Sequence, residues 1–230
     1  ASKAGLRTTV YPLTQERASE YLVDAARELA SAGPVRPAAQ KMPALEPDVQ
    51  AIHEQLDRKG QVVLYGPPGT GKTWRALQAA EELVARKIDQ KPWGQLSAER
   101  RRALKEPGDA QRIWTCTFHP AYGYEDFVEG LRPVPVTGGL DFQPQAGLFR
   151  RICQQARKYP NEPFVLVIDE FNRGDAPRIF GELLTLLEMD KREGSPVELP
   201  YSHTSFTVPR GLRVLATMNT ADRSISLLDA

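Results

Sequence analysis

The sequence predicts an α/β fold with a mostly parallel central sheet, organised around a glycine-rich loop. Residues 66–73 read Gly-Pro-Pro-Gly-Thr-Gly-Lys-Thr, which is the pattern G-x-x-x-x-G-K-[ST]. Apolar residues 62–65 precede it as a short buried strand, and residues 74–86 follow it with helical periodicity. A second, nearly continuous apolar run, 164–168, ends in two acidic residues. Such runs are typical of parallel strands that are covered by helices on both faces.

The glycine-rich loop has the residue types that hold a polyphosphate. Its glycines let the backbone bend so that successive N–H groups and the helix N-terminus face phosphate oxygens. Lys72 is expected to reach the β and γ phosphates, and the Thr73 hydroxyl to hold Mg²⁺. A turn that binds nothing is the alternative, which the flanking strand and helix disfavour. The predicted nucleotide-binding residues are Gly66, Pro67, Pro68, Gly69, Thr70, Gly71, Lys72, Thr73 and Trp74.

Composition and charge allow one α/β domain and a little more. The chain has 230 residues, 41% of them hydrophobic, and a formal net charge of +1, so no global attraction to nucleic acid is expected. Cys116 falls in a predicted strand and Cys153 in a predicted helix, which favours two reduced core residues over a disulfide. No apolar run approaches ~18 residues and no signal peptide is visible, which predicts a cytoplasmic protein without a membrane partner.

The N-terminal residues are expected to lie outside the nucleotide-binding domain. Residues 14–31 have the amphipathic pattern of a helix, and a Pro/Ala-rich stretch separates them from the rest of the chain. A second helix begins at Pro47 and ends at Gly60, just before the first strand. The predicted division is therefore 1–42, an N-terminal helix and linker, and 43–230, the nucleotide-binding domain.

Residues 87–111 read as a polar insertion after the first nucleotide-binding helix. A short helix, 98–105, is predicted inside it with Ser97 as its N-cap. Its basic residues could contact DNA phosphates, although a solvated helix face is the commoner role of such a cluster. Residues 112–118 alternate as a second strand, and His119 beyond them has no partner ligands at zinc spacing. The basic residues are Arg100, Arg101, Arg102 and Lys105.

Further elements follow from turn residues and periodicity. Glycines and prolines in 133–147 predict a β-hairpin that turns near Gly138 and Gly139, with residues 134–143 standing off the sheet. Two more helices, a second hairpin and a last buried strand are expected after it. The helices are predicted over 148–159 and 178–190, the hairpin over 197–199 and 205–208, and the strand over 212–217.

The two acidic residues after the run 164–168 match a Walker B motif. The carboxyl end of a parallel strand is where α/β proteins present catalytic groups. Asp169 is expected to hold Mg²⁺, and Glu170 to orient and deprotonate the attacking water. Asn219, just past the last strand, suits a group that positions this water or senses the γ-phosphate; an asparagine that caps a turn is the alternative.

Four segments together resemble the AAA+ module of the McrB family, the nucleotide-hydrolysing subunits of McrBC modification-dependent restriction systems. They are GPPGTGKT at 66–73, TFHPAYGYEDFVEGLRPV at 117–134, IDEFNR at 168–173 and TMNTADRSISLLDA at 217–230. The resemblance implies a P-loop NTPase (AAA+) three-layer fold with a hairpin inserted in helix 2 and another before the sensor 1 strand. Asn172 matches the family's Asn in DE-x-N and Asn219 matches sensor 1, so both join Glu170 as expected catalytic residues.

The resemblance also implies a cofactor and partners. These are Mg²⁺ with ATP or GTP as substrate, a hexameric ring, an McrC-like nuclease subunit, and DNA reached through the ring pore or through other domains. The hairpin at 134–143 is expected to face that pore. Family members continue past the LLDA stretch into an arginine finger and a helical lid, so the fragment that ends at Ala230 is expected to lack the lid, to turn over slowly and to be mostly monomeric.

Two other functions stay open at this point. A MoxR-like or dynein-related module that remodels proteins would share the P-loop and the Walker B motif. A nucleotide-binding scaffold without turnover is disfavoured by the intact Glu170 and Asn219. The sequence does not identify the base of the nucleotide.

Overall fold

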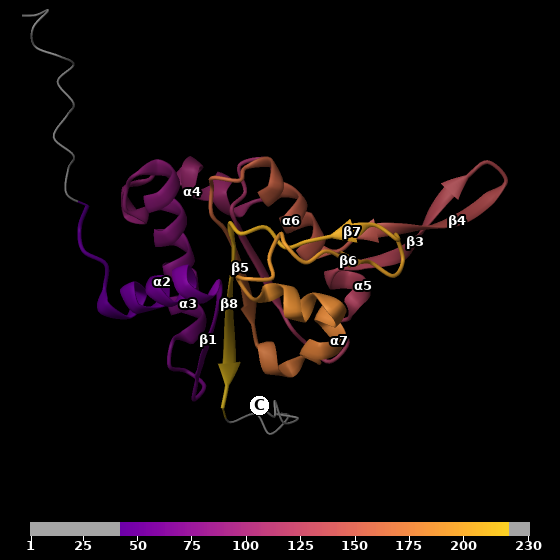
Figure 1. The fold of residues 1–230 in the computed structure, drawn as a ribbon. Helices are drawn as coiled ribbons and strands as arrows, with labels where there is room; N and C mark the ends of the chain where they lie inside the picture. Colours follow the sequence, from indigo (N-terminus) through magenta and orange to yellow (C-terminus); the bar gives the residue numbers. More distant parts are fainter. Residues whose placement is uncertain (1–41, 221–230) are drawn as a thin grey trace, which may run out of the picture. The chain divides into compact units, whose positions relative to one another are not determined.

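The computed structural model describes residues 42–220, whose centre is a parallel sheet. Its strands are β1 (Gln61–Gly66), β2 (Ile113–Thr117), β5 (Phe164–Asp169) and β8 (Leu212–Asn219). In this part of the chain the strand order is β1-β8-β5-β2, and every pairing is parallel. Figure 1 shows helices on both faces of the sheet, which is the predicted three-layer α/β fold. The predicted helix at 14–31 lies outside the described residues.

Helices α2 (Pro47–Lys59) and α3 (Lys72–Val84) pack in one hydrophobic core with the sheet. The boundaries of α2 are those predicted: proline occupies its first turn, and Gly60 ends it in the left-handed conformation at φ +76°. The helix predicted over 74–86 begins earlier, at Lys72. Its C-terminal end continues as a π-helix, Ala85–Asp89.

Residues 87–111, predicted as an insertion, are packed against this same core. They contain a 3₁₀ turn (Trp93–Gln95) and α4 (Ala98–Lys105). Leu96 and Leu104 are buried among the side chains of α2 and α3. The segment is therefore an integral part of the domain surface.

Three basic residues of α4, namely Arg100, Arg102 and Lys105, form ion pairs with acidic residues of the same chain. Ser97 caps the helix as predicted, because its hydroxyl accepts the N–H of Arg100 at 3.2 Å. Each ion pair neutralises a charge that a DNA phosphate would otherwise meet, which supports the solvated-face interpretation. The pairs are Arg100 with Asp89 at 3.0 Å, Arg102 with Glu106 at 2.7 Å, and Lys105 with Glu81.

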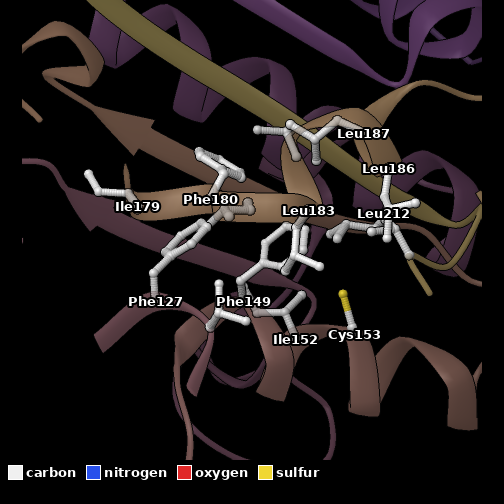
Figure 2. Close-up of a cluster of buried hydrophobic side chains, with 14 of the residues drawn as sticks. Phe127, Phe149, Ile152, Cys153, Ile179, Phe180, Leu183, Leu186, Leu187 and Leu212 are labelled. Carbon is white, nitrogen blue, oxygen red and sulfur yellow. The ribbon is translucent and has the colours of Figure 1, made fainter. Parts of the chain in front are cut away.

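A second core, rich in aromatic side chains, lies on the other face of the sheet (Figure 2). The Phe127 ring centroid lies 4.7 Å from that of Phe180 and 5.2 Å from that of Phe149. Strand β5 contributes to both cores, since Leu166 and Ile168 belong to this one and the alternate residues to the other. The helices that contribute to this core are α5 (Tyr124–Phe127), α6 (Leu148–Lys158) and α7 (Ala176–Phe180).

The prediction of a single helix over 178–190 is wrong. The structure has the short α7, which ends at Phe180, and then a 3₁₀ helix, Gly181–Leu187. Gly181 adopts φ +53° and ψ −133°, outside the helical region, and a Cβ there would lie 3.0 Å from the Tyr124 ring. The apolar spacing that predicted a helix also fits a 3₁₀ helix, so periodicity could not separate the two.

A long hairpin, β3 (Glu129–Val136) with β4 (Gly139–Ala146), extends away from the sheet (Figure 1). The predicted hairpin at 134–143 is therefore confirmed, although its strands begin and end farther from the turn. Gly138 takes φ +98° at that turn.

One face of this hairpin is apolar and exposed over the three pairs nearest the turn on that face. Directly paired residues share a face, and the pairs Leu131–Pro144, Pro133–Phe142 and Pro135–Leu140 alternate with pairs that include Arg132, Gln143 and Asp141. The apolar face thus contains three prolines, and all six residues are exposed to solvent.

A second hairpin, β6 (Val197–Glu198) with β7 (Ser205–Phe206), is confirmed but shorter than predicted. The buried Glu129 carboxylate joins its loop to the base of the long hairpin, accepting the N–H groups of Tyr201 at 2.9 Å and Ser202 at 3.0 Å. Arg150 of α6 donates to the same carboxylate. One fully buried acid therefore holds three segments together.

Glu129→Ala is expected to lower the free energy of unfolding by about 3–5 kcal/mol, because it leaves a guanidinium and two N–H groups without their buried acceptor. Urea denaturation would measure the change. Glu106→Ala, which breaks an exposed ion pair, is the matched control and should have a much smaller effect. Equal losses in the two variants would contradict the structural role of Glu129.

Cys116 and Cys153 are free thiols, as predicted. Burial raises the pKa of each thiol to about 12, so both are protonated at neutral pH. Of the helices between residues 42 and 220, none combines the length and the apolar character needed to cross a membrane.

Candidate nucleotide-binding site

The glycine-rich loop connects β1 to the N-terminus of α3. Gly69 and Gly71 adopt φ +78° and +76°, a conformation that side chains with a Cβ rarely take. Nothing lies within 4 Å of a Cβ built at either position, so the backbone angles and not a lack of space require glycine there. Helix α3 starts directly after Gly71, so its unpaired N–H groups and positive dipole end face the loop.

The Lys72 side chain crosses the loop. Its Nζ donates to the Pro67 carbonyl at 2.7 Å and lies 3.4 Å from Thr70 Oγ1, which itself donates to the Pro67 carbonyl at 2.9 Å. An ammonium group has three donors, so these two contacts leave a donor for a phosphate oxygen. The Lys72 ammonium group is therefore held within the loop with a donor available to an anion.

Asp169, at the end of β5, accepts hydrogen bonds from two hydroxyl groups on one carboxylate oxygen. Thr73 Oγ1 donates to Asp169 Oδ1 at 2.8 Å, and Thr217 Oγ1 donates to the same atom. Because the Thr73 proton points to the carboxylate, the lone pairs of its oxygen stay available to a cation. Hydroxyl and carboxylate oxygens are hard donors of the kind that Mg²⁺ prefers, so this donor set fits Mg²⁺.

A group of three or more His, Cys, Asp or Glu side chains that could hold a metal ion is not found among residues 42–220. A cation at Thr73 and Asp169 would therefore take its other ligands from water and substrate. Mg²⁺ is commonly bound in this way, through one or two protein oxygens and phosphate groups.

The three predicted catalytic residues are hydrogen-bonded to one another. Asn219 Nδ2 donates to both carboxylate oxygens of Glu170, at 2.9 Å each, and Asn172 Nδ2 donates to the backbone oxygen of Asn219 at 3.1 Å. Arg173 Nε lies 3.3 Å from Glu170 Oε2. Glu170 has φ +53°, an uncommon conformation for a residue with a side chain and one that often marks a functional site. The 3₁₀ turn Phe171–Arg173 follows it.

A cavity of about 390 Å³ brings these groups together, in the size range of small-molecule sites. It lies at the carboxyl ends of β1, β5 and β8. Of the predicted residues, Gly66, Pro67, Thr70 and Asn172 do not line it; Asn172 is connected to it by the hydrogen bond to Asn219. The lining residues are Pro68, Gly69, Gly71, Lys72, Thr73, Trp74, Asp169, Glu170, Thr217 and Asn219.

Thr217 is the site residue that sequence reasoning missed. The last strand was predicted to end at this residue, whereas β8 continues to Asn219. Alternation along a strand places residues 217 and 219 on the same face, so the assignment of Asn219 already contained a signal for Thr217.

Together these features define a P-loop nucleoside triphosphatase domain of the AAA+ type. A phosphate loop leads into α3, an Asp-Glu pair ends β5, and an asparagine ends the neighbouring strand β8. The chain belongs to the family of AAA domains of the dynein-related subfamily, whose model matches residues 94–230.

Two curated proteins that are similar in sequence to this chain are named as parts of restriction enzymes. The chain is 35% identical over 188 residues to the EcoKMcrB subunit of the type IV methyl-directed restriction enzyme of Escherichia coli strain K12, an alignment that covers 80% of this chain and 36% of the relative. It is 26% identical over 203 residues to YdiS, a component of the type II restriction enzyme BsuMI of Bacillus subtilis strain 168, covering 73% of this chain and 52% of the relative. The aligned chain thus spans only part of each relative's length.

Proposed function

We propose that this chain is the nucleotide-hydrolysing module of a restriction system, which binds ATP or GTP with Mg²⁺ and cleaves the bond to the γ-phosphate. The observation that carries the proposal is the cavity in which Lys72, Thr73, Asp169, Glu170 and Asn219 meet. Each of them has the residue type that phosphoryl transfer to water needs at that place. A scaffold that only binds nucleotide would not need Glu170.

The residues divide the work between binding and chemistry. Lys72 and the backbone N–H groups of the loop bind the β and γ phosphates, and the α3 dipole adds to that attraction. Thr73 and Asp169 hold Mg²⁺, which neutralises phosphate charge when it is bound. Glu170 orients the attacking water and accepts its proton. Asn219 fixes the plane of the Glu170 carboxylate, and Asn172 fixes Asn219 through its backbone oxygen.

The names of the relatives support a role in restriction. One is a subunit of a methyl-directed restriction enzyme and the other a component of a type II restriction enzyme. We therefore infer a hexameric ring, a nuclease partner and DNA as the molecules with which the whole protein works. Neither relative's name favours the alternative, remodelling of proteins. The β3–β4 hairpin, which stands away from the sheet, is the element that we assign to the ring pore (Figure 1).

Slow turnover by the isolated 230 residues is part of the proposal. In P-loop enzymes an arginine from a neighbouring subunit contributes about 10³–10⁵ in rate. A chain that does not assemble into a ring would not receive such an arginine.

Competition binding tests the proposal and identifies the base. A fluorescent triphosphate analogue bound in the presence of Mg²⁺ is displaced by ATP or by GTP, and we expect at least one of them to compete at micromolar concentration. The matching monophosphate, which lacks the phosphates that Lys72 contacts, should compete far more weakly. Failure of both triphosphates to displace the analogue, or equal displacement by the monophosphates, would contradict the proposal.

A further inference from the structure

We propose that Thr217 is a positioning residue for the Mg²⁺ site, acting through Asp169 and through the backbone of Glu170. The inference rests on the proposed function, because it concerns the same cavity. Thr217 lies on the inner strand β8 beside the end of β5, and only 2% of it is exposed to solvent. It neither belongs to the phosphate loop nor follows β5 in sequence, and the motif that it begins, TMNTADRSISLLDA, drew attention to Asn219 instead.

The first contact orients the carboxylate that holds the cation. Asp169 Oδ1 accepts hydroxyl protons from both Thr73, in α3, and Thr217, in β8. A carboxylate held by one donor can turn about its terminal bond, whereas two donors from different elements fix its plane. Groups behind a metal ligand orient the ligand in this way, and their loss typically costs about 10–100-fold in metal affinity or activity.

The second contact reaches the residue that we assign as the base. The Glu170 N–H points to Thr217 Oγ1 at 3.4 Å, a long hydrogen bond. A hydroxyl has one proton to donate and lone pairs to accept, so Thr217 can serve Asp169 and Glu170 at the same time. Glu170 sits in the uncommon left-handed conformation, which persists where the surrounding structure supports it. One buried hydroxyl therefore connects the two acidic residues of the site.

Packing in the core does not require a hydroxyl group at position 217. The residues before it on β8, Leu215 and Ala216, are buried and apolar. Valine has nearly the shape of threonine and suits a buried strand at least as well. The hydroxyl is thus explained by its two partners in the site.

The test compares Thr217→Val, which removes the hydroxyl, with Thr217→Ser, which keeps it. Binding of a fluorescent non-hydrolysable ATP analogue and of its GTP counterpart to the full chain is measured over a series of Mg²⁺ concentrations and in EDTA. Thr217→Val should raise the Mg²⁺ concentration for half-maximal binding about 10–100-fold. It should leave affinity in EDTA unchanged, because the loop and Lys72 are intact. Thr217→Ser should restore most of the Mg²⁺ response.

Three results would overturn the inference: a wild-type Mg²⁺ response in Thr217→Val, a loss in Thr217→Ser as large as in Thr217→Val, or an equal loss with and without Mg²⁺. Circular dichroism checks folding, and Thr217→Ala replaces the valine variant under the same criteria if valine prevents folding. Asp169→Asn separates this inference from the proposed function. If it weakens the Mg²⁺ response and Thr217→Val does not, only the Thr217 inference fails; if neither does, the metal assignment fails.

Discussion

Glu170→Gln is expected to reduce nucleotide hydrolysis by about 10²–10⁴-fold, the usual contribution of a general base, while nucleotide affinity stays close to that of the wild type. The amide keeps the size of the carboxylate and one oxygen that can accept from Asn219 Nδ2, but it cannot take a proton from water. Phosphate release under saturating nucleotide measures the rate, and titration of a fluorescent analogue measures the affinity. Wild type and variant are compared as the same full-length protein under the same conditions.

Glu106→Gln is the control for this experiment, because Glu106 is exposed and pairs with Arg102 beside α4. It should leave both rate and affinity unchanged. If Glu170→Gln lowered nucleotide affinity as strongly as it lowered the rate, Glu170 would be a binding residue and the assignment of the base would be wrong.

Lys72→Ala should abolish measurable nucleotide binding in the same titration. Hydrogen bonds to charged groups contribute about 1.5–3 kcal/mol each, and we expect the ammonium to contact both the β and the γ phosphate. Since 1.4 kcal/mol corresponds to a factor of ten, the expected loss of affinity is about 10²-fold or more. This substitution removes binding, whereas Glu170→Gln removes chemistry, so the pair separates the two roles.

Lys105→Ala provides the matched control, since Lys105 pairs with Glu81 and does not line the cavity. Its affinity for nucleotide should equal that of the wild type. Wild-type affinity in Lys72→Ala would remove the basis for assigning the loop to phosphate binding.

The parts of this fold that sequence could predict are those with local causes. Helix α2 has a proline at its start and a left-handed glycine at its end, and Ser97 caps α4, so short-range geometry determines where these helices lie. The loop before α3 and the Asp-Glu pair after β5 are contiguous motifs, so their residues were identified directly.

The features that sequence could not predict depend on residues far apart in the chain. Gly181 interrupts the helix that was predicted across it, and a Cβ at this position would lie against the Tyr124 ring. Helical periodicity carries no information about such a long-range contact. Thr217 contacts Asp169 only because β8 lies beside β5, and this strand order comes from the assembled sheet and not from the sequence of either strand. The pairing of Lys105 with Glu81, which supports the solvated-face interpretation of the basic cluster, likewise joins residues far apart in the sequence.

The prolines of the long hairpin have a consequence for solubility. A two-stranded hairpin that stands off its domain exposes two strand edges, and such edges can recruit strands of other molecules and start cross-β aggregation. Proline has no N–H to donate, so within a ladder it occupies positions that face outward. Pro133 and Pro135 therefore interrupt the free edge of β3, and Pro144 that of β4. The hairpin can present Leu140 and Phe142 to a partner through side-chain contacts while its edges remain poor templates for fibril growth.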